Sequence, residues 1–130
     1  MIATSIEQSK RLVELGLDIS TADMYWEEEI NITKIVVGNY SLHMQCMQDK
    51  DYKKHSNPVI SPAWSLTALL ELMPELDGRN PGLNRIINTN KWWMLYHSTA
   101  SLSLIRTKEC DNPLDSAFEM ICWLLKNNKL

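Results

Sequence analysis

The C-terminal stretch Asp111–Leu130 constrains the fold most, because it combines the start signal of an α-helix with a long apolar stripe. Asn112 suits the N-cap position, since its side-chain carbonyl can accept a hydrogen bond from a free backbone N–H of the first turn. Pro113 has no N–H to lose at the first helical position, and Asp115 lies near the positive end of the helix dipole. Over residues 114–125, apolar side chains recur at three- and four-residue spacing. The rest of the chain is therefore expected to cover one face of a C-terminal helix.

Two further helices are predicted upstream. The first covers Thr4–Leu15, where a capping box can start at Thr4 or at Ser5, each of which has a Glu or Gln three residues later. Gly16 follows at the position where a left-handed C-cap is common. The second covers Ser65–Met73, whose first residue can cap it, and the proline that follows cannot continue it.

The strand predictions depend on alternation and on β-branched or aromatic content. Strands are predicted over Ala22–Glu29, Ile30–Val37, Tyr40–Cys46, Lys91–Ser98 and Ser101–Thr107. The stretch Lys91–Ser98 is apolar on both faces, which is typical of a central strand, and the short gap after it favours an antiparallel hairpin. Asp49–Asn57 and Glu75–Asn90 are predicted to be irregular, with one helical turn around Leu83.

These elements predict an α+β fold in a single domain spanning residues 1–130. About three helices would pack on a sheet of about four mostly antiparallel strands, with the C-terminal helix on one face of the sheet. A chain of 130 residues is long enough to bury a core without metals or disulfides.

Charge and cysteine content limit the kinds of partner and the cellular compartment that the sequence predicts. The formal net charge is −3 and no basic stripe is present, which argues against nucleic-acid binding. The first 60 residues hold more acids than bases, so mimicry or regulation of nucleic acid is kept as a third hypothesis. Three cysteines without a CxxC pair predict no disulfide framework, and Cys122 is expected to be a buried thiol. With neither a signal peptide nor a membrane span in the sequence, we expect a cytoplasmic protein with no membrane partner.

No motif for catalysis, cofactor binding or metal binding is found, so the sequence predicts no catalytic residue, no cofactor and no metal. His43 and Cys46 are three apart, which on a strand puts them on opposite faces. The acidic run Glu27–Glu29 is interpreted as a solvated edge. The alternative hypothesis is a small-molecule binder or enzyme, with His43 or His97 beside Glu71 in a pocket between sheet and helices.

The aromatic residues carry the leading functional hypothesis. Five tryptophans in 130 residues is a high number, and adjacent tryptophans on a strand must point to opposite faces. Exposed aromatic side chains are typical anchors of protein interfaces. The candidate interaction surface consists of Tyr25, Trp26, Trp64, Trp93 and Trp123. We therefore expect a non-catalytic interaction protein that binds a protein partner or forms a homodimer.

Three motifs add a family resemblance. Residues 20–25 read STADMY, residues 62–74 read PAWSLTALLELMP, and residues 111–118 read DNPLDSAF. In this order and spacing they resemble a group of small uncharacterised proteins encoded by prophages and mobile elements of gut bacteria. The similarity covers most of the chain, and Glu27–Val37 is its least familiar part. The group has no assigned activity, so the resemblance implies an accessory role in a phage-like element of a bacterium and no catalytic residues.

Overall fold

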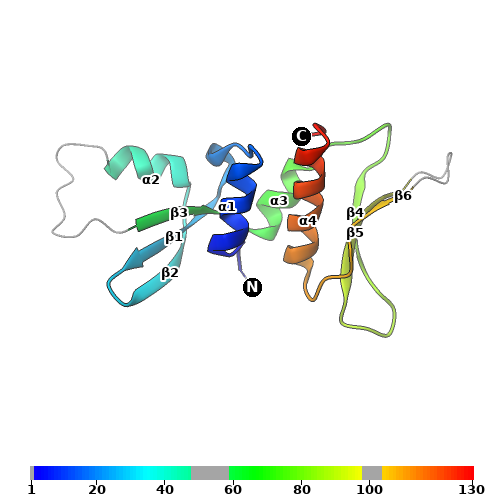
Figure 1. Cartoon of the computed structure of the whole chain (residues 1–130), viewed down its shortest axis with the longest axis horizontal. Helices are drawn as coiled ribbons and strands as arrows, with labels where there is room; N and C mark the ends of the chain where they lie inside the picture. Colours follow the sequence, from blue (N-terminus) through cyan, green and yellow to red (C-terminus); the bar gives the residue numbers. More distant parts are fainter. Residues whose placement is uncertain (1, 48–58, 98–103) are drawn as a thin grey trace. The chain divides into compact units, whose positions relative to one another are not determined.

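The computed structural model describes residues 2–47, 59–97 and 104–130. Contacts divide the chain into two compact units, Ile2–Ala68 and Leu69–Leu130. Within the described residues there are four α-helices and two three-stranded antiparallel sheets (Figure 1). The α+β class is confirmed, although the structure has more strands and one more α-helix than predicted. That the chain forms one domain over residues 1–130 stays a prediction, and the units are described separately.

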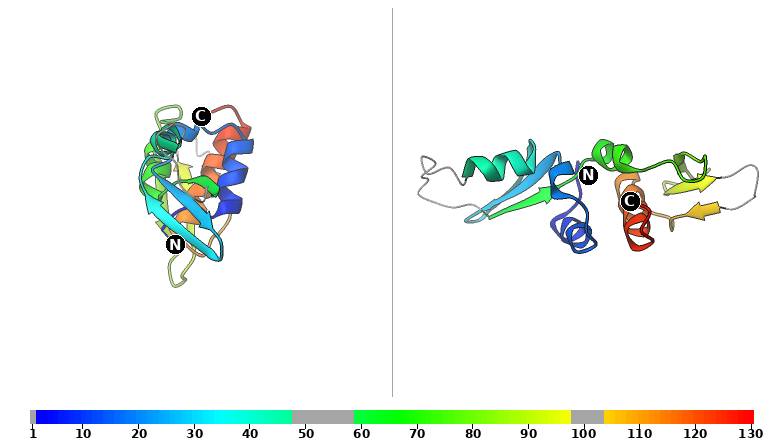
Figure 2. Two further views of the ribbon diagram at one scale, coloured as in Figure 1. Left: turned by 90° about the vertical axis from the view of Figure 1, so that its left-hand side faces the viewer. Right: turned by 90° about the horizontal axis from the view of Figure 1, so that it is seen from above.

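The first unit contains one sheet with β1 at its centre. Its elements are α1 (Ile6–Glu14), the 3₁₀ turn η1 (Ile19–Thr21), β1 (Met24–Glu29), β2 (Ile32–Val37), α2 (Tyr40–Met47) and β3 (Val59–Ala63). The sheet order is β2-β1-β3, and both pairs are antiparallel. In both views of Figure 2 the cyan hairpin β1–β2 has the green strand β3 alongside β1. Helix α1 packs against β3.

Helix α1 confirms one of the two predicted capping boxes. The Ser5 hydroxyl accepts a hydrogen bond from the N–H of Gln8 at 3.1 Å, and the Gln8 side chain accepts one from the N–H of Ser5 at 3.0 Å. Gly16 has φ +99°, so the glycine beyond the helix takes the left-handed conformation that its position predicts. Both ends of this helix therefore follow from residues next to it in the sequence, the capping pair Ser5 and Gln8 at the start and the conformational freedom of Gly16 at the end.

The prediction of a strand over Tyr40–Cys46 is wrong, because this stretch is helix α2. The side chain of Asn39 accepts a hydrogen bond from the N–H of Leu42 at 3.0 Å. The backbone carbonyl of Asn39 accepts one from the backbone N–H of His43, also at 3.0 Å. This local N-cap starts a helix, and it outweighs a short period-two pattern. The imidazole of His43 then stacks on Tyr25, with ring centroids 4.5 Å apart.

The second unit is built around β5 and α4. It contains most of α3 (Leu66–Leu72), which begins in the first unit, followed by β4 (Pro81–Arg85), β5 (Trp92–His97), β6 (Leu104–Arg106) and α4 (Pro113–Lys126). The antiparallel sheet has the order β4-β5-β6, so β5 is central as predicted. Helix α4 packs against β5, which agrees with the predicted packing of the last helix on a sheet.

The prediction of an irregular segment over Glu75–Asn90 is wrong where β4 lies. Leu83, predicted to be in a helical turn, is paired with Met94 of β5. Pro81 is the first residue of this edge strand, a position where a missing N–H is tolerated. Turn residues flank β4 on both sides and favour an irregular segment in the sequence. In the structure, Asp77 before the strand and Asn88 after it have φ values of +50° and +62°. The predicted loop at Asp49–Asn57 and the connection before β6 lie outside the described residues.

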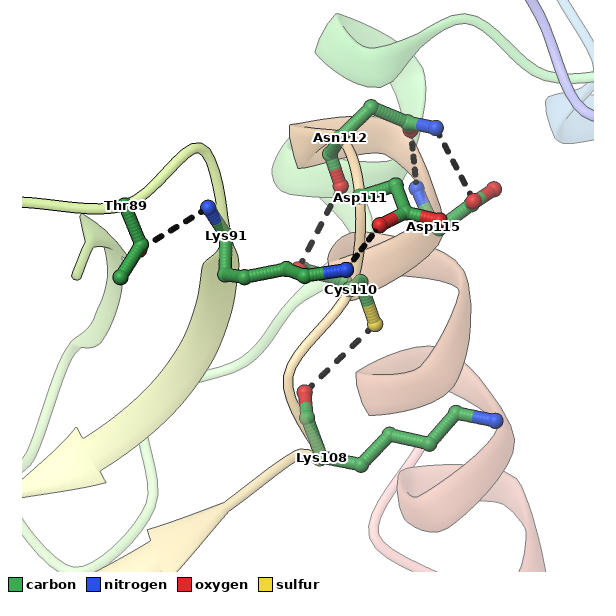
Figure 3. A network of polar contacts seen from close by, with 8 residues as sticks. Thr89, Lys91, Lys108, Cys110, Asp111, Asn112 and Asp115 are labelled. Atoms are coloured by element: carbon green, nitrogen blue, oxygen red, sulfur yellow. Dashed lines mark hydrogen bonds and ion pairs between the residues drawn. The ribbon is translucent and has the colours of Figure 1, made fainter.

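The start of α4 is fixed by side chains (Figure 3). The side-chain carbonyl of Asn112 accepts a hydrogen bond from the backbone N–H of Asp115 at 2.8 Å. The side-chain amide of Asn112 donates one to the Asp115 carboxylate at 2.9 Å. Next to this cap, Lys91 at the start of β5 forms an ion pair with Asp111. That hydrogen bond raises the pKa of Lys91 and lowers the pKa of Asp111. Both groups are solvent-exposed, so the pair contributes little to stability.

The buried phenol of Tyr96 should make the stability of the second unit depend on pH. Its side chain is buried, its hydroxyl donates to the carbonyl of Pro74 at 2.7 Å, and burial raises its pKa to about 12. The folded state holds the phenolic proton more tightly than the unfolded state, so stability should fall as the pH rises above about 10. Tyr96→Phe should cost about 1 kcal/mol at neutral pH through the lost hydrogen bond. Urea unfolding from about pH 8 to about pH 11 should show this difference shrinking as the pH rises, and a constant difference would contradict the prediction.

Candidate protein-interaction surface

Two of the five residues of the predicted aromatic surface are core residues in the structure. Trp64 is 0% exposed, and its indole N–H donates to the hydroxyl of Thr21 at 2.9 Å. Tyr25 is 8% exposed and is covered by the stacked ring of His43. Neither side chain presents a free aromatic face in the described structure, so neither is included in the surface proposed below.

The other three aromatic side chains are partly exposed. In the first unit, the indole N–H of Trp26 donates to the carbonyl of Thr4 at 2.8 Å. In the second unit, Trp93 lies under the guanidinium of Arg106, 4.4 Å from the ring centroid, and Trp123 lines a cavity beside α4. That these residues act in binding stays a prediction.

The first two motifs of the family resemblance contact each other in the first unit. Besides the bond from Trp64 to Thr21, the carboxylate of Asp23 accepts hydrogen bonds from the N–H of Ser65 at 2.8 Å and from its hydroxyl at 2.5 Å. The Ser65 hydroxyl in turn accepts from the N–H of Ala68 at 3.1 Å, which caps α3 as predicted. These hydrogen bonds give the two motifs a structural role, because they hold residues 20–25 against residues 64 and 65. They assign no chemical activity to either motif.

Strand β2 differs from the edge strands β3 and β4. Strand β3 contains Pro62 and β4 begins with Pro81. Prolines are a common way in which proteins prevent unwanted pairing at a sheet edge. Strand β2, with the sequence ITKIVV, has six residues, no proline and β-branched side chains everywhere except at Lys34. Its edge is therefore better suited than those of β3 and β4 to accept another strand.

The hydrogen-bonding side of β2 can be assigned from its pairing. Beyond the end of the hairpin, the N–H of Gly38 donates to the carbonyl of Asp23 at 3.0 Å. Because inward- and outward-facing groups alternate along an antiparallel pair, the even-numbered residues of Ile32–Val37 direct N–H and C=O toward β1. The odd-numbered residues direct theirs away from β1, so the outer edge offers donors and acceptors at residues 33, 35 and 37.

Apolar side chains are exposed along the same hairpin. Ile30 at its turn is 88% exposed, Ile32 is 60% exposed and Val37 is 77% exposed. The one cation on the strand, Lys34, is directed toward β1, where its Nζ lies 3.7 Å from the carboxylate of Glu27. Sequence reasoning recognised the β-branched content of this stretch. It missed the edge, because strand order is set by contacts with β3, far along the chain.

The other candidates for a functional site are metal-ligating and titratable side chains. No group of three or more His, Cys, Asp or Glu among them could hold a metal ion. His43 is occupied by its stacking on Tyr25, Glu71 is exposed on α3, and the side chain of His97 lies outside the described set. A pocket built from His43 or His97 with Glu71 stays a prediction.

Two further expectations from the sequence concern cysteines and membrane spans. Cys122 is buried as predicted, and burial raises the pKa of the Cys110 thiol. No described helix is both long and apolar enough to cross a membrane.

Comparison with known proteins gives no relative from which a role could be transferred. The chain matches no protein-family model, no curated protein sequence and no solved structure.

Proposed function

We propose that the chain is a non-catalytic accessory protein that acts through protein–protein contacts, and that it associates with a second copy of itself through β2. The observation that carries this proposal is the outer edge of β2, which pairs with no described strand, contains no proline and is flanked by exposed apolar side chains. Addition of a strand at such an edge gains main-chain hydrogen bonds, and the side chains on either face select the partner.

A second copy fits this edge in one preferred register. Two antiparallel copies of β2 can pair with Ile35 opposite Ile35 or, shifted by one residue in each copy, with Lys34 opposite Lys34 or with Val36 opposite Val36. The Val36 register leaves the outward-facing groups of Thr33 opposite Asn39, beyond the end of the strand. Like charges directly opposite one another are destabilising, which disfavours the Lys34 register. In the first register Thr33 lies opposite Val37, and all the outward-facing backbone groups find partners. The product would be a continuous six-stranded sheet with two-fold symmetry, the commonest symmetry of homo-oligomers.

The same register gives Trp26 a role. Trp26 is the cross-strand neighbour of Ile35 on β1, so both side chains lie on the same face of the sheet. Pairing about Ile35 would cover part of this face, including the half-buried indole of Trp26. The aromatic anchor expected from sequence would then support the interface from the adjacent strand.

The biological setting is also a proposal. An accessory role in a prophage or other mobile element is supported by the resemblance of the STADMY, PAWSLTALLELMP and DNPLDSAF motifs alone.

The test is the mass of the protein in solution. Multi-angle light scattering and sedimentation equilibrium from about 10 to about 200 μM should give a species of twice 15.0 kDa. Ile35→Pro should yield a monomer, because proline removes an N–H that faces the second copy and leaves the pairing with β1 intact.

A matched pair of variants controls for surface hydrophobicity. Val37→Lys and Val59→Lys both place a charge on an exposed valine of the same sheet face, on the opposite edges β2 and β3. Val37→Lys should weaken dimerisation by about tenfold or more, and Val59→Lys should leave it unchanged. A monomeric wild-type protein at the highest concentration, or a dimer that survives Ile35→Pro, would rule out the proposal.

A further inference from the structure

A groove lies between α1 and the outer edge of β3 in the first unit. Its cavity has a volume of about 270 Å³ and is lined by one face of α1 around Val13 and by Ile60, Ser61 and Pro62 of β3. Consecutive residues of a strand point to opposite faces of the sheet, so a cavity that contacts all three lies along the edge of β3. This is the edge of the sheet opposite β2.

The backbone of β3 directs hydrogen-bonding groups into this groove. Trp64, just beyond the strand, shows their direction, because its carbonyl accepts from the N–H of Thr4 at 2.9 Å and its N–H donates to the Thr4 hydroxyl at 3.1 Å. By the alternation of an antiparallel pair, the N–H and C=O of Ile60 and the C=O of Pro62 also point away from β1. Among the residues that the structure describes, no strand pairs with these groups. The groove therefore offers one donor and two acceptors at the spacing of a β-ladder.

The chain already places an extended segment of its own on this edge. Ala3 forms an antiparallel bridge with Ser65, beyond the end of β3. After Ser5 the chain turns into α1, so the edge beside Ile60 and Pro62 is left without a strand partner in the described structure. A second extended segment would continue along β3 the pairing that residues 3 and 4 begin.

Pro62 limits the length of segment that can pair here. Proline has no N–H, so a long strand would lose a ladder hydrogen bond at this position. This loss agrees with the choice of β2 as the edge for a second copy. A segment of a few residues needs only the three groups that remain at Ile60 and Pro62.

The side walls of the groove suit an aliphatic side chain. Val13 is 41% exposed on α1, and Ile60 and Pro62 are partly exposed on β3. The Ser9 hydroxyl, also in the lining, is already hydrogen-bonded to the hydroxyl of Thr4 at 2.8 Å. The volume is below the range of drug-sized ligand sites, so it fits a side chain better than a larger molecule.

The charges around the groove favour a carboxylate. Glu14 is paired with Arg11, with 3.7 Å between the two charged groups. Lys10 lines the groove and is exposed, and it forms no ion pair with any residue that the structure describes. One cation therefore remains to attract an acid next to the bound side chain.

We propose that this groove binds a short extended segment of a protein partner, which adds to the edge of β3 and places an aliphatic side chain between Val13 and Ile60. A carboxylate beside that side chain would pair with Lys10. The inference rests on the proposed role in protein–protein contacts and adds the kind of partner, but it does not depend on the dimer. Pairing through β2 would leave one β3 edge open in each copy.

The test uses the capped peptide acetyl-TVTVE-amide as the probe and ¹⁵N–¹H NMR spectra of the full chain as the readout. The backbone amide signal of Ile60 should shift saturably, with a dissociation constant below about 2 mM. Acetyl-TSTSE-amide, which keeps the backbone and the charge without the aliphatic side chains, should bind at least about fivefold more weakly. Acetyl-TVTVK-amide should also bind more weakly, because its charge is repelled by Lys10.

Variants on both walls show whether the groove is responsible. Val13→Asp places a charge in the apolar wall, and Ile60→Pro removes the outward N–H without removing a bond to β1, so each should weaken binding by about fivefold or more. Leu42→Asp places the same charge on an exposed leucine of α2 in the same unit, outside the groove, so it should leave binding unchanged. Unchanged circular dichroism would show that the variants fold.

The outcome also separates this groove from the β2 edge. Ile35→Pro should bind the peptide as the wild type does, and a monomeric wild-type protein would count against the dimer alone. The groove proposal is overturned by the absence of a saturable shift at about 5 mM peptide, by shifts at the Ile35 amide in place of Ile60, by equal binding of acetyl-TSTSE-amide, or by an equal effect of Leu42→Asp.

Discussion

Trp64→Ala is expected to lower the free energy of unfolding of the first unit by about 3 to 5 kcal/mol. The side chain is 0% exposed, so its removal leaves a large cavity in the core. It also removes the indole N–H that donates to the hydroxyl of Thr21 at 2.9 Å. Urea unfolding followed by circular dichroism measures the change without relying on the fluorescence of the deleted indole.

Trp26→Ala is the matched control for this variant. Trp26 lies in the same unit and its indole N–H also donates one hydrogen bond, to the carbonyl of Thr4 at 2.8 Å, but the side chain is only half-buried. Its replacement removes less buried apolar surface, so the loss should be clearly smaller than for Trp64→Ala. Equal losses for the two variants, or a loss below about 1 kcal/mol for Trp64→Ala, would contradict the assignment of Trp64 to the core.

Asp23→Ala should have the second-largest effect, a loss of about 2 to 3 kcal/mol. The Asp23 carboxylate accepts two hydrogen bonds from Ser65, one from its N–H at 2.8 Å and one from its hydroxyl at 2.5 Å. Because the Ser65 hydroxyl also accepts from the N–H of Ala68, removing the carboxylate weakens the cap of α3 as well. Equilibrium unfolding in urea measures the loss.

A double-mutant cycle separates this network from a general effect of the substitution. If Asp23 acts mainly through Ser65, the combined variant Asp23→Ala/Ser65→Ala should be less destabilised than the sum of the two single variants. Asp23→Asn keeps an acceptor for the Ser65 N–H, so its loss should lie between those of wild type and Asp23→Ala. Strict additivity of the two alanine variants would show that Asp23 and Ser65 do not act as a unit.

The helices that could be predicted from sequence are those whose ends are set by adjacent residues. Asn112 and Pro113 define the start of α4, and Ser5 with Gln8 defines the start of α1. These signals are local, so they hold whatever the rest of the chain does. The central strand β5 was predictable for a related reason, since a segment that is apolar on both faces has few other places in a fold.

The errors arise where a distant contact or a competing local signal decides the structure. Helix α2 has a strand-like alternation, but the side chain of Asn39 caps it as a helix. Strand β4 contains Pro81 and lies between turns, and only its pairing with β5 makes it a strand. At α2 the alternation of side chains is outweighed by this local cap. At β4 the sequence pattern carries no information about the pairing partner.

The candidate sites were less predictable than the fold. Tryptophan content directed attention to five aromatic residues, yet burial separates Trp64 and Tyr25 from the rest. The edge of β2 follows from strand order, and the groove beside α1 follows from the packing of α1 against β3. Neither strand order nor packing can be read from spacing along a single chain.

The contact between Thr4 and Trp64 bears on how the first unit folds as well as on its stability. The N–H of Thr4 donates to the carbonyl of Trp64 at 2.9 Å, and the N–H of Trp64 donates to the hydroxyl of Thr4 across a sequence separation of 60 residues. A contact between residues so far apart in sequence raises the contact order of the unit, and such contacts slow folding because the entropy of loop closure is lost before the contact forms. During synthesis, the segment that precedes α1 has no partner for these bonds until Trp64 has been added. This unit can therefore be completed only after Trp64 has been added, long after its first helix can form.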